Sequence, residues 1–126
     1  MIRPDLPQLA LSIRQPWAAA ILAGKDIENR SRRTNIRGRI CIHVGAWNAA
    51  DYEARGFIAD QGIALPANPD LRRNGIIGTV EIVDCVDHSD SPWFFGPYGY
   101  VLRDPQPCEF IYVPGMLGFF DWRKRL

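Results

Sequence analysis

The side chains best equipped for chemistry follow one glycine near the start of the chain. Lys25, Glu28 and Arg30 all lie within six residues of Gly24, and Asn29 stands among them. An ammonium, a carboxylate and a guanidinium so close together can hold a polar ligand by charge-assisted hydrogen bonds or exchange protons with it. A plainer role also fits, because a lysine favours the negative end of a helix and an exposed Glu–Arg pair adds little stability. The residue types alone leave both interpretations open.

The elements that position these residues can be read from the preceding stretch. Leu9 to Ile13 alternates in the two-residue period of a short strand. Pro16 suits the first turn of a helix, and Trp17 and Ile21, four residues apart, share one helix face. Gly24 is the expected helix stop, since glycine takes the left-handed conformation without a steric penalty. The stretch predicts a strand, a short helix, a sharp stop and a second strand.

Several motifs resemble one known family. L-S-I-R-Q-P-W-A, G-K-D-I-E-N-R and R-G-R-I-C-I-H occur in that order, followed by S-P-W-F-F-G-P-Y-G-Y-V-L and P-G-M-L-G-F-F. They resemble the ASCH domain, a branch of the PUA-like superfamily, from about Leu9 to Phe120. Many members have Arg-Ser-Trp after the glutamate, where this chain has Arg30, Ser31 and Arg32. A guanidinium, which can also stack on a base but brings charge, thus replaces an aromatic ring.

The resemblance implies a fold and the location of a site. The order of elements, with Gly- and Pro-rich turns among the later strands, is compatible with an α+β fold: a small mixed β-barrel flanked by two or more short helices. Residues 1–126 are expected to form a single domain. The implied binding cleft lies between the barrel and the helix that follows the first strand. The ligand-binding residues expected there are Gln15, Trp17, Lys25, Glu28, Arg30 and Glu81.

Glu81 interrupts the longest strand signal, Gly75 to Val86, whose two faces are otherwise largely apolar. A carboxylate on a buried strand must find a partner or take a raised pKa. The resemblance makes Lys25 or Arg30 its natural partner, although spacing alone cannot bring them together. The alternative is an ordinary glutamate that points outward from a half-exposed strand.

Five arginines fall between Arg30 and Arg39 with no acidic residue among them. Arginine binds phosphate well because its planar fork matches the phosphate oxygens. Nucleic-acid backbone contacts are therefore expected from Arg32, Arg33, Arg37 and Arg39. A solvated loop without a partner is the alternative interpretation.

Other patterns complete the expected element list. Strands are predicted at Arg39–Val44, Tyr100–Leu102 and Phe110–Val113, with the last two joined by a turn at Asp104–Pro105. A second helix is predicted from an N-cap at Asn48 to about Asp60, with Tyr52 and Phe57 packing on the sheet. Gly118–Phe120 is expected to close the barrel edge. The aromatic loop from Trp93 to Tyr100 fits either core packing or a stacking surface for bases.

Composition narrows the class of protein. With 47% hydrophobic residues, 23% charged residues and a net charge of +1, the chain reads as a globular protein without a membrane span or signal peptide. The cysteines Cys41, Cys85 and Cys108 show no metal-ligand spacing, which favours reduced thiols in the cytoplasm. No metal site and no cofactor are expected.

Three functions remain open at this level. The first is a module that binds RNA, another single-stranded nucleic acid or a modified nucleoside, as PUA-like relatives generally do. The second is a hydrolase, either a ribonuclease or an amidohydrolase acting on N4-acetylcytidine, with Lys25, Glu28 and Glu81 as catalytic residues. That amidohydrolase branch has a threonine where this chain has Glu28, so a threonine-dependent step would be lost. The third is a protein-interaction domain.

Overall fold

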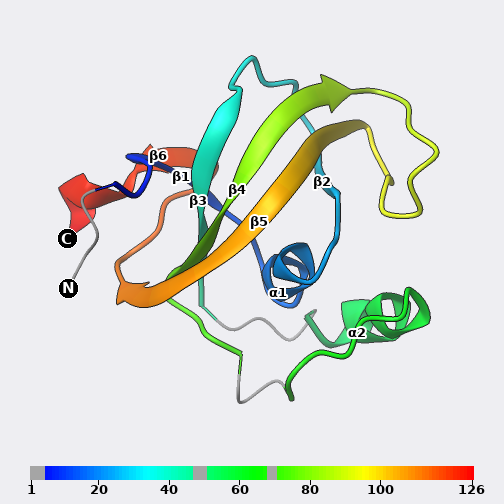
Figure 1. Ribbon diagram of the computed structural model, residues 1–126, viewed down its shortest axis with the longest axis horizontal. Coiled ribbons are helices and arrows are strands. Elements are labelled where there is room, and N and C mark those ends of the chain that lie inside the picture. Colours follow the sequence, from blue (N-terminus) through cyan, green and yellow to red (C-terminus); the bar gives the residue numbers. More distant parts are fainter. Residues whose placement is uncertain (1–4, 47–50, 68–70) are drawn as a thin grey trace.

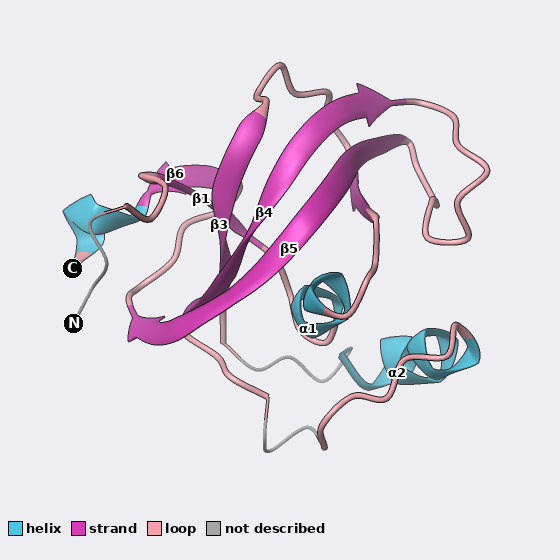
Figure 2. Cartoon of the chain, viewed as in Figure 1, coloured by secondary structure: helices cyan, strands magenta, loops and turns pink. Residues whose placement is uncertain are grey.

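The structure, a computed structural model, describes residues 5–46, 51–67 and 71–126, without the side chains of residues 51–53. The strands are β1 Leu9–Ser12, β2 Ile27–Arg30, β3 Gly38–Val44, β4 Gly75–Val86, β5 Tyr98–Tyr112 and β6 Phe119–Asp121. The helices are α1 Trp17–Leu22 and α2 Asp51–Asp60, with a short 3-10 helix at Trp122–Arg125 (Figures 1 and 2).

All six strands belong to one mixed sheet in the order β2-β5-β4-β3-β1-β6. Strand β1 runs parallel to β3, and the other neighbouring strands of this sheet pair antiparallel. The sheet curls into a half-barrel, with α1 packed against one side of it and α2 lying beyond α1 (Figure 1). This confirms the predicted α+β fold, a small mixed barrel flanked by short helices.

The core lies on both sides of the central strands. The inner cluster joins Ile21 of α1 to Leu11, Ile40 and Ile82 from three strands. A second cluster lies on the opposite side of the sheet and includes Cys41. Because strand side chains alternate between faces, two apolar layers explain the near-continuous apolar runs in β3 and β4.

The cysteines are free thiols, and burial raises the pKa of Cys41 to about 12. Cys41 therefore acts as a small core residue and not as a nucleophile. No helix among the described residues is long and apolar enough to cross a membrane.

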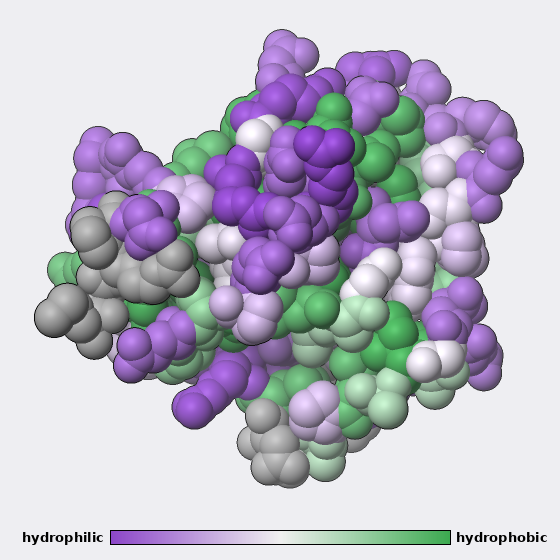
Figure 3. Space-filling view, in the orientation of Figure 1, coloured by the Kyte–Doolittle hydropathy of each residue, from purple (hydrophilic) through white to green (hydrophobic). Residues whose placement is uncertain are grey.

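One prediction about the later strands was wrong. Tyr100–Leu102 and Phe110–Val113 belong to one continuous strand, β5, and are not two strands joined by a turn. Asp104 takes a left-handed conformation with φ of 54°, and the β4–β5 register shifts at three places along the pair. Asp104–Pro105, which the sequence predicts as a turn, lies at one of these register shifts within β5. Such bulges bend the long strands. Figure 3 shows hydrophilic side chains gathered over the middle of β3, β4 and β5.

Helix α2 meets the rest of the molecule through aromatic rings. Phe57 contacts Trp17 and Trp93, with ring centroids 6.3 and 5.5 Å away. These three residues, with Ile27 of β2, form part of a third apolar cluster between α1, α2 and the loop before β5. The predicted N-cap Asn48 lies outside the described residues, as does the side chain of Tyr52.

Candidate functional site

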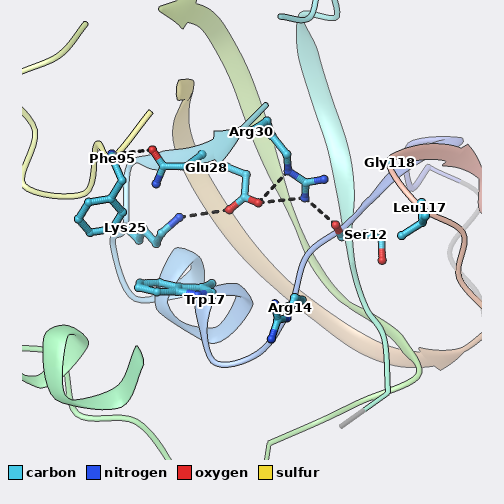
Figure 4. A pocket seen from close by; sticks show the side chains of 10 residues that line it. Ser12, Arg14, Trp17, Lys25, Glu28, Arg30, Phe95, Leu117 and Gly118 are labelled. Atoms are coloured by element: carbon cyan, nitrogen blue, oxygen red, sulfur yellow. Dashed lines mark hydrogen bonds and ion pairs between the residues drawn. The ribbon is translucent and has the colours of Figure 1, made fainter. Parts of the chain in front are cut away.

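A cleft of about 380 Å³ opens between α1, β2 and two loops. Helix α1 and the turn after it form one wall, β2 forms the floor, and the loops before β5 and before β6 form the rim (Figure 4). The residues that line it are Ser12, Arg14, Trp17, Lys25, Glu28, Asn29, Arg30, Phe95, Leu117 and Gly118.

Lys25 is buried at the base of the cleft. Gly24, with φ of 122°, turns the chain back after α1 and places Lys25 beside the helix it has just left. The Lys25 Nζ atom donates to the carbonyl of Ile27 and to Glu28 Oε1 at 3.2 Å, and it lies 5.5 Å from the ring centre of Trp17. Burial lowers the pKa of Lys25, while the Glu28 carboxylate opposes that shift.

Glu28 lies between two cations. Its Oε1 accepts from Lys25, and its Oε2 lies 2.9 Å from Arg30 Nη2. Glu28 and Arg30 are two residues apart on β2, so their side chains leave the same face of the strand. The result is a row of cation, anion and cation along the cleft floor, with one excess positive charge (Figure 4).

Arg30 also connects β2 to β1 across the open side of the curled sheet. Its Nη2 donates to the carbonyl of Ser12 at the end of β1, at 2.6 Å. Strands β1 and β2 are not hydrogen-bonded neighbours in the sheet, so this bond crosses the gap between them. Arg30 therefore stabilises the fold and shapes the cleft at the same time.

Asn29 holds the aromatic rim in place. Its side-chain amide donates to the carbonyl of Trp93 at 2.9 Å, and its Oδ1 accepts from the backbone N–H groups of Phe95 and Gly96. The anchored loop presents Phe95, 58% exposed, at the edge of the cleft, with its ring 6.4 Å from that of Trp17. Two aromatic rings thus lie together at the Lys25 end of the charged floor (Figure 4).

Gln15 does not line the cleft. Its Oε1 accepts from the N–H of Ala19 at 2.9 Å, and its Nε2 donates to the carbonyl of Arg72 at 3.0 Å. Both ends of this buried side chain are therefore engaged in holding α1 to the segment before β4. Its ligand-binding role stays a prediction that the lining of the cleft does not support.

The partner expected for Glu81 was wrong. Glu81 pairs with Arg103 of β5 at 3.1 Å, and neither Lys25 nor Arg30 is its partner. Ile82, the next residue along β4, packs in the inner cluster with Ile21 of α1. Neighbouring strand side chains point to opposite faces, so Glu81 points away from α1, on what we call the outer face of the sheet. It is not among the cleft-lining residues.

Acidic residues from the end of β4 and from β5 lie near most of the arginine cluster. Arg33 pairs with Asp87 at 2.9 Å, and Arg37 lies 3.8 Å from Asp84. Arg39 donates to Thr79 and also pairs with Asp104 at 2.8 Å. The sequence places these acids far from the arginines, so the pairing was not visible in it.

The side chain of Arg32 is exposed and forms no ion pair or hydrogen bond with the described residues. Its role in backbone contacts, like those of Arg33, Arg37 and Arg39, stays a prediction.

Sequence reasoning missed several lining residues. Phe95 belongs to the aromatic loop, for which a stacking role was one of two interpretations. Nothing in the sequence predicted that Leu117 would line the cleft; it lies at the rim, 99% exposed. Within the described residues, no group of three His, Cys, Asp or Glu side chains lies close enough to hold a metal ion.

Comparison with known proteins supports the resemblance. A scan against models of protein families matches the ASCH domain over residues 11–106. The match includes α1, β2 and every cleft-lining residue except Leu117 and Gly118. A search of curated proteins found no match.

Proposed function

The chain belongs to the ASCH domain family, a PUA-like fold family whose members generally bind RNA, and on that premise we propose that its cleft binds one nucleobase of single-stranded RNA. The observation that carries this proposal is the charged row on the cleft floor, with two aromatic rings at its Lys25 end (Figure 4). Aromatic faces stack on bases, and fixed donors and acceptors read their edges.

The charged row suits base recognition because its members are held in place. Lys25 is 3% exposed and Glu28 is 8% exposed, and each makes two fixed contacts. A preordered donor and acceptor lose little entropy when a ligand arrives. The cleft volume of about 380 Å³ also falls within the range of small-molecule sites, roughly 300–1,000 Å³.

Single-stranded RNA is the form that such a cleft can engage. A base inside a duplex is stacked and paired, so its edge and faces are covered, whereas an unpaired base can be turned out and inserted. The net positive floor, together with Arg32, which has no ion-pair partner among the described residues, favours a polyanion over a neutral ligand.

Titration of labelled RNA tests the proposal directly. We expect single-stranded RNA to bind more tightly than duplex RNA, and the affinity to fall as salt rises from roughly 50 to 200 mM. An oligonucleotide of the same length with an abasic site at the bound position is the matched control, because it keeps the backbone but lacks the base. Equal binding of the abasic and intact strands would contradict a base-binding cleft. Absence of binding to any RNA would favour a protein-interaction domain.

A hydrolase is the second candidate, favoured by one observation. Lys25 has a pKa lowered by burial and touches a carboxylate inside a cleft, an arrangement found in acid–base catalysis. Against it, both oxygens of Glu28 already accept hydrogen bonds from cations, and Glu81 does not reach the cleft. Incubation with N4-acetylcytidine, followed by chromatography for cytidine, decides whether this chemistry occurs. Release of cytidine that is lost in Lys25→Met would establish it.

A further inference from the structure

A second hollow adjoins the cleft. It measures about 600 Å³ and shares Arg30, Leu117 and Gly118 with the cleft lining, so the two spaces meet at these residues. We call it the arginine groove. It is lined by Arg30, Ser31, Arg32, Arg33, Thr34, Tyr100, Leu117, Gly118 and Phe119.

The arginines that line the arginine groove differ in whether their side chains already have a partner. Arg30 is occupied by Glu28 and by the carbonyl of Ser12, and Arg33 is occupied by Asp87. Among the described lining residues, Arg32 is the arginine whose side chain has no such partner. An unneutralised guanidinium at the edge of a hollow attracts an anion and can bind phosphate through two parallel N–H groups.

The backbone that carries Arg32 is held in place. The hydroxyl of Tyr100 donates to the carbonyl of Arg32 at 3.0 Å, and the Tyr100 ring stacks on Phe119. Two residues later, Thr34 Oγ1 accepts from the N–H of Ile36 at 3.1 Å. A fixed backbone reduces the entropy lost when the guanidinium engages an anion, which distinguishes this segment from a solvated loop.

We propose that the arginine groove is a phosphate subsite, in which Arg32 binds the phosphate attached to the nucleotide whose base occupies the cleft. This inference rests on the proposed function and narrows the ligand from a nucleoside to a nucleotide within a strand. Leu117 lines both spaces, and Figure 4 shows it at the end of the cleft away from Lys25 and Phe95. Its apolar side chain would face the ribose, between base and phosphate.

The test replaces one phosphate charge at a time. In the single-stranded RNA that the wild-type protein binds best, a neutral methylphosphonate is placed at each linkage in turn, and the affinity of each strand is measured. We expect one linkage, next to the inserted base, to cost roughly tenfold in affinity. In Arg32→Gln, unmodified RNA should bind roughly tenfold more weakly, and the methylphosphonate at that linkage should cost nothing further.

Arg103→Gln is the matched control, because it removes one positive charge from the outer face of the sheet. It should keep the wild-type profile of linkage effects. Equal costs at all linkages, or the same profile in Arg32→Gln as in the wild-type protein, would overturn the phosphate subsite while leaving the base cleft intact. Failure of the wild-type protein to bind any RNA would overturn the proposed function, and the subsite with it.

Discussion

Two glutamates of this small protein show how the same ion-pair chemistry serves different ends. Glu28 lies on the cleft floor, 8% exposed, between Lys25 and Arg30. Glu81 lies on the outer face of the sheet and pairs with Arg103, whose side chain is 67% exposed. The Glu28 carboxylate is buried away from water, whereas the Glu81 carboxylate remains in contact with solvent.

The difference matters because removing a charge from water is costly. A buried ion pair recovers that cost only through good geometry, whereas an exposed pair costs and contributes little. The Lys25–Glu28–Arg30 row lies on the floor of the cleft, where a ligand would enter. The outer pair lies on the face of the sheet opposite to the inner cluster, and neither of its residues lines the cleft.

The largest expected effect follows from neutralising each glutamate. Glu28→Gln leaves two buried or half-buried cations facing a neutral amide, and we expect the free energy of unfolding to fall by about 3–5 kcal/mol. Glu81→Gln should lower it by less than about 1 kcal/mol. Urea denaturation of both variants measures the contrast. Similar losses in the two variants would show that the cleft is wetter than the contacts imply.

Removing the rim aromatic tests the binding side of the comparison. Phe95→Ala should weaken binding of single-stranded RNA by about 1–3 kcal/mol, the usual contribution of a ring stacked on a base. Tyr112→Ala is the matched control, since Tyr112 is an exposed ring, 71% accessible, on β5 outside the cleft lining. Fluorescence titration compares the two. Equal losses would place the RNA elsewhere on the surface.

Local signals predicted the part of the fold that builds the cleft. Leu9–Ile13, the apolar face of Trp17 and Ile21, and the stop at Gly24 each depend on residues only a few positions apart. The structure places a strand, a short helix and a left-handed glycine there. Short-range periodicity and backbone preference were sufficient for these elements.

The face on which Glu81 lies could not be predicted in the same way. Three register shifts between β4 and β5 decide which side chains meet the core, and a shift of one residue exchanges the two faces. The ion pairs of Arg33 and Arg37 likewise join residues about fifty positions apart. Leu117 gained its place at the rim only because β6 returns to pair with β1. Long-range pairing determines these features, and a single sequence does not show which distant residues pair.

The charge state of Lys25 gives a smaller, pH-dependent effect. Because burial lowers its pKa below the usual 10.5, the folded protein releases this proton before the unfolded chain does as the pH rises. The unfolded state then holds more protons, so the contribution of Lys25 to the free energy of unfolding increases with pH. We expect the wild-type protein to gain stability relative to Lys25→Met between neutral pH and ~pH 10, by about 1.4 kcal/mol per unit of lowering.

Urea titrations at several pH values measure this gain. Lys124→Met, which removes the only other lysine, controls for the general loss of a lysine charge. A stability difference between wild type and Lys25→Met that shrinks as the pH rises would mean that the ion pair with Glu28 outweighs burial. The cleft would then resemble the outer face more closely than its geometry indicates.

The smallest effect is expected for the outer pair itself. A double-mutant cycle of Glu81→Gln and Arg103→Gln should give a coupling energy below about 1 kcal/mol, and added salt should reduce it further. Both side chains reach solvent, so water and ions compete with the 3.1 Å contact. RNA affinity should be unchanged in all three variants, because neither residue lines the cleft or the arginine groove. A coupling of several kcal/mol, or a loss of RNA binding, would return Glu81 to the functional site and remove the distinction between the two glutamates.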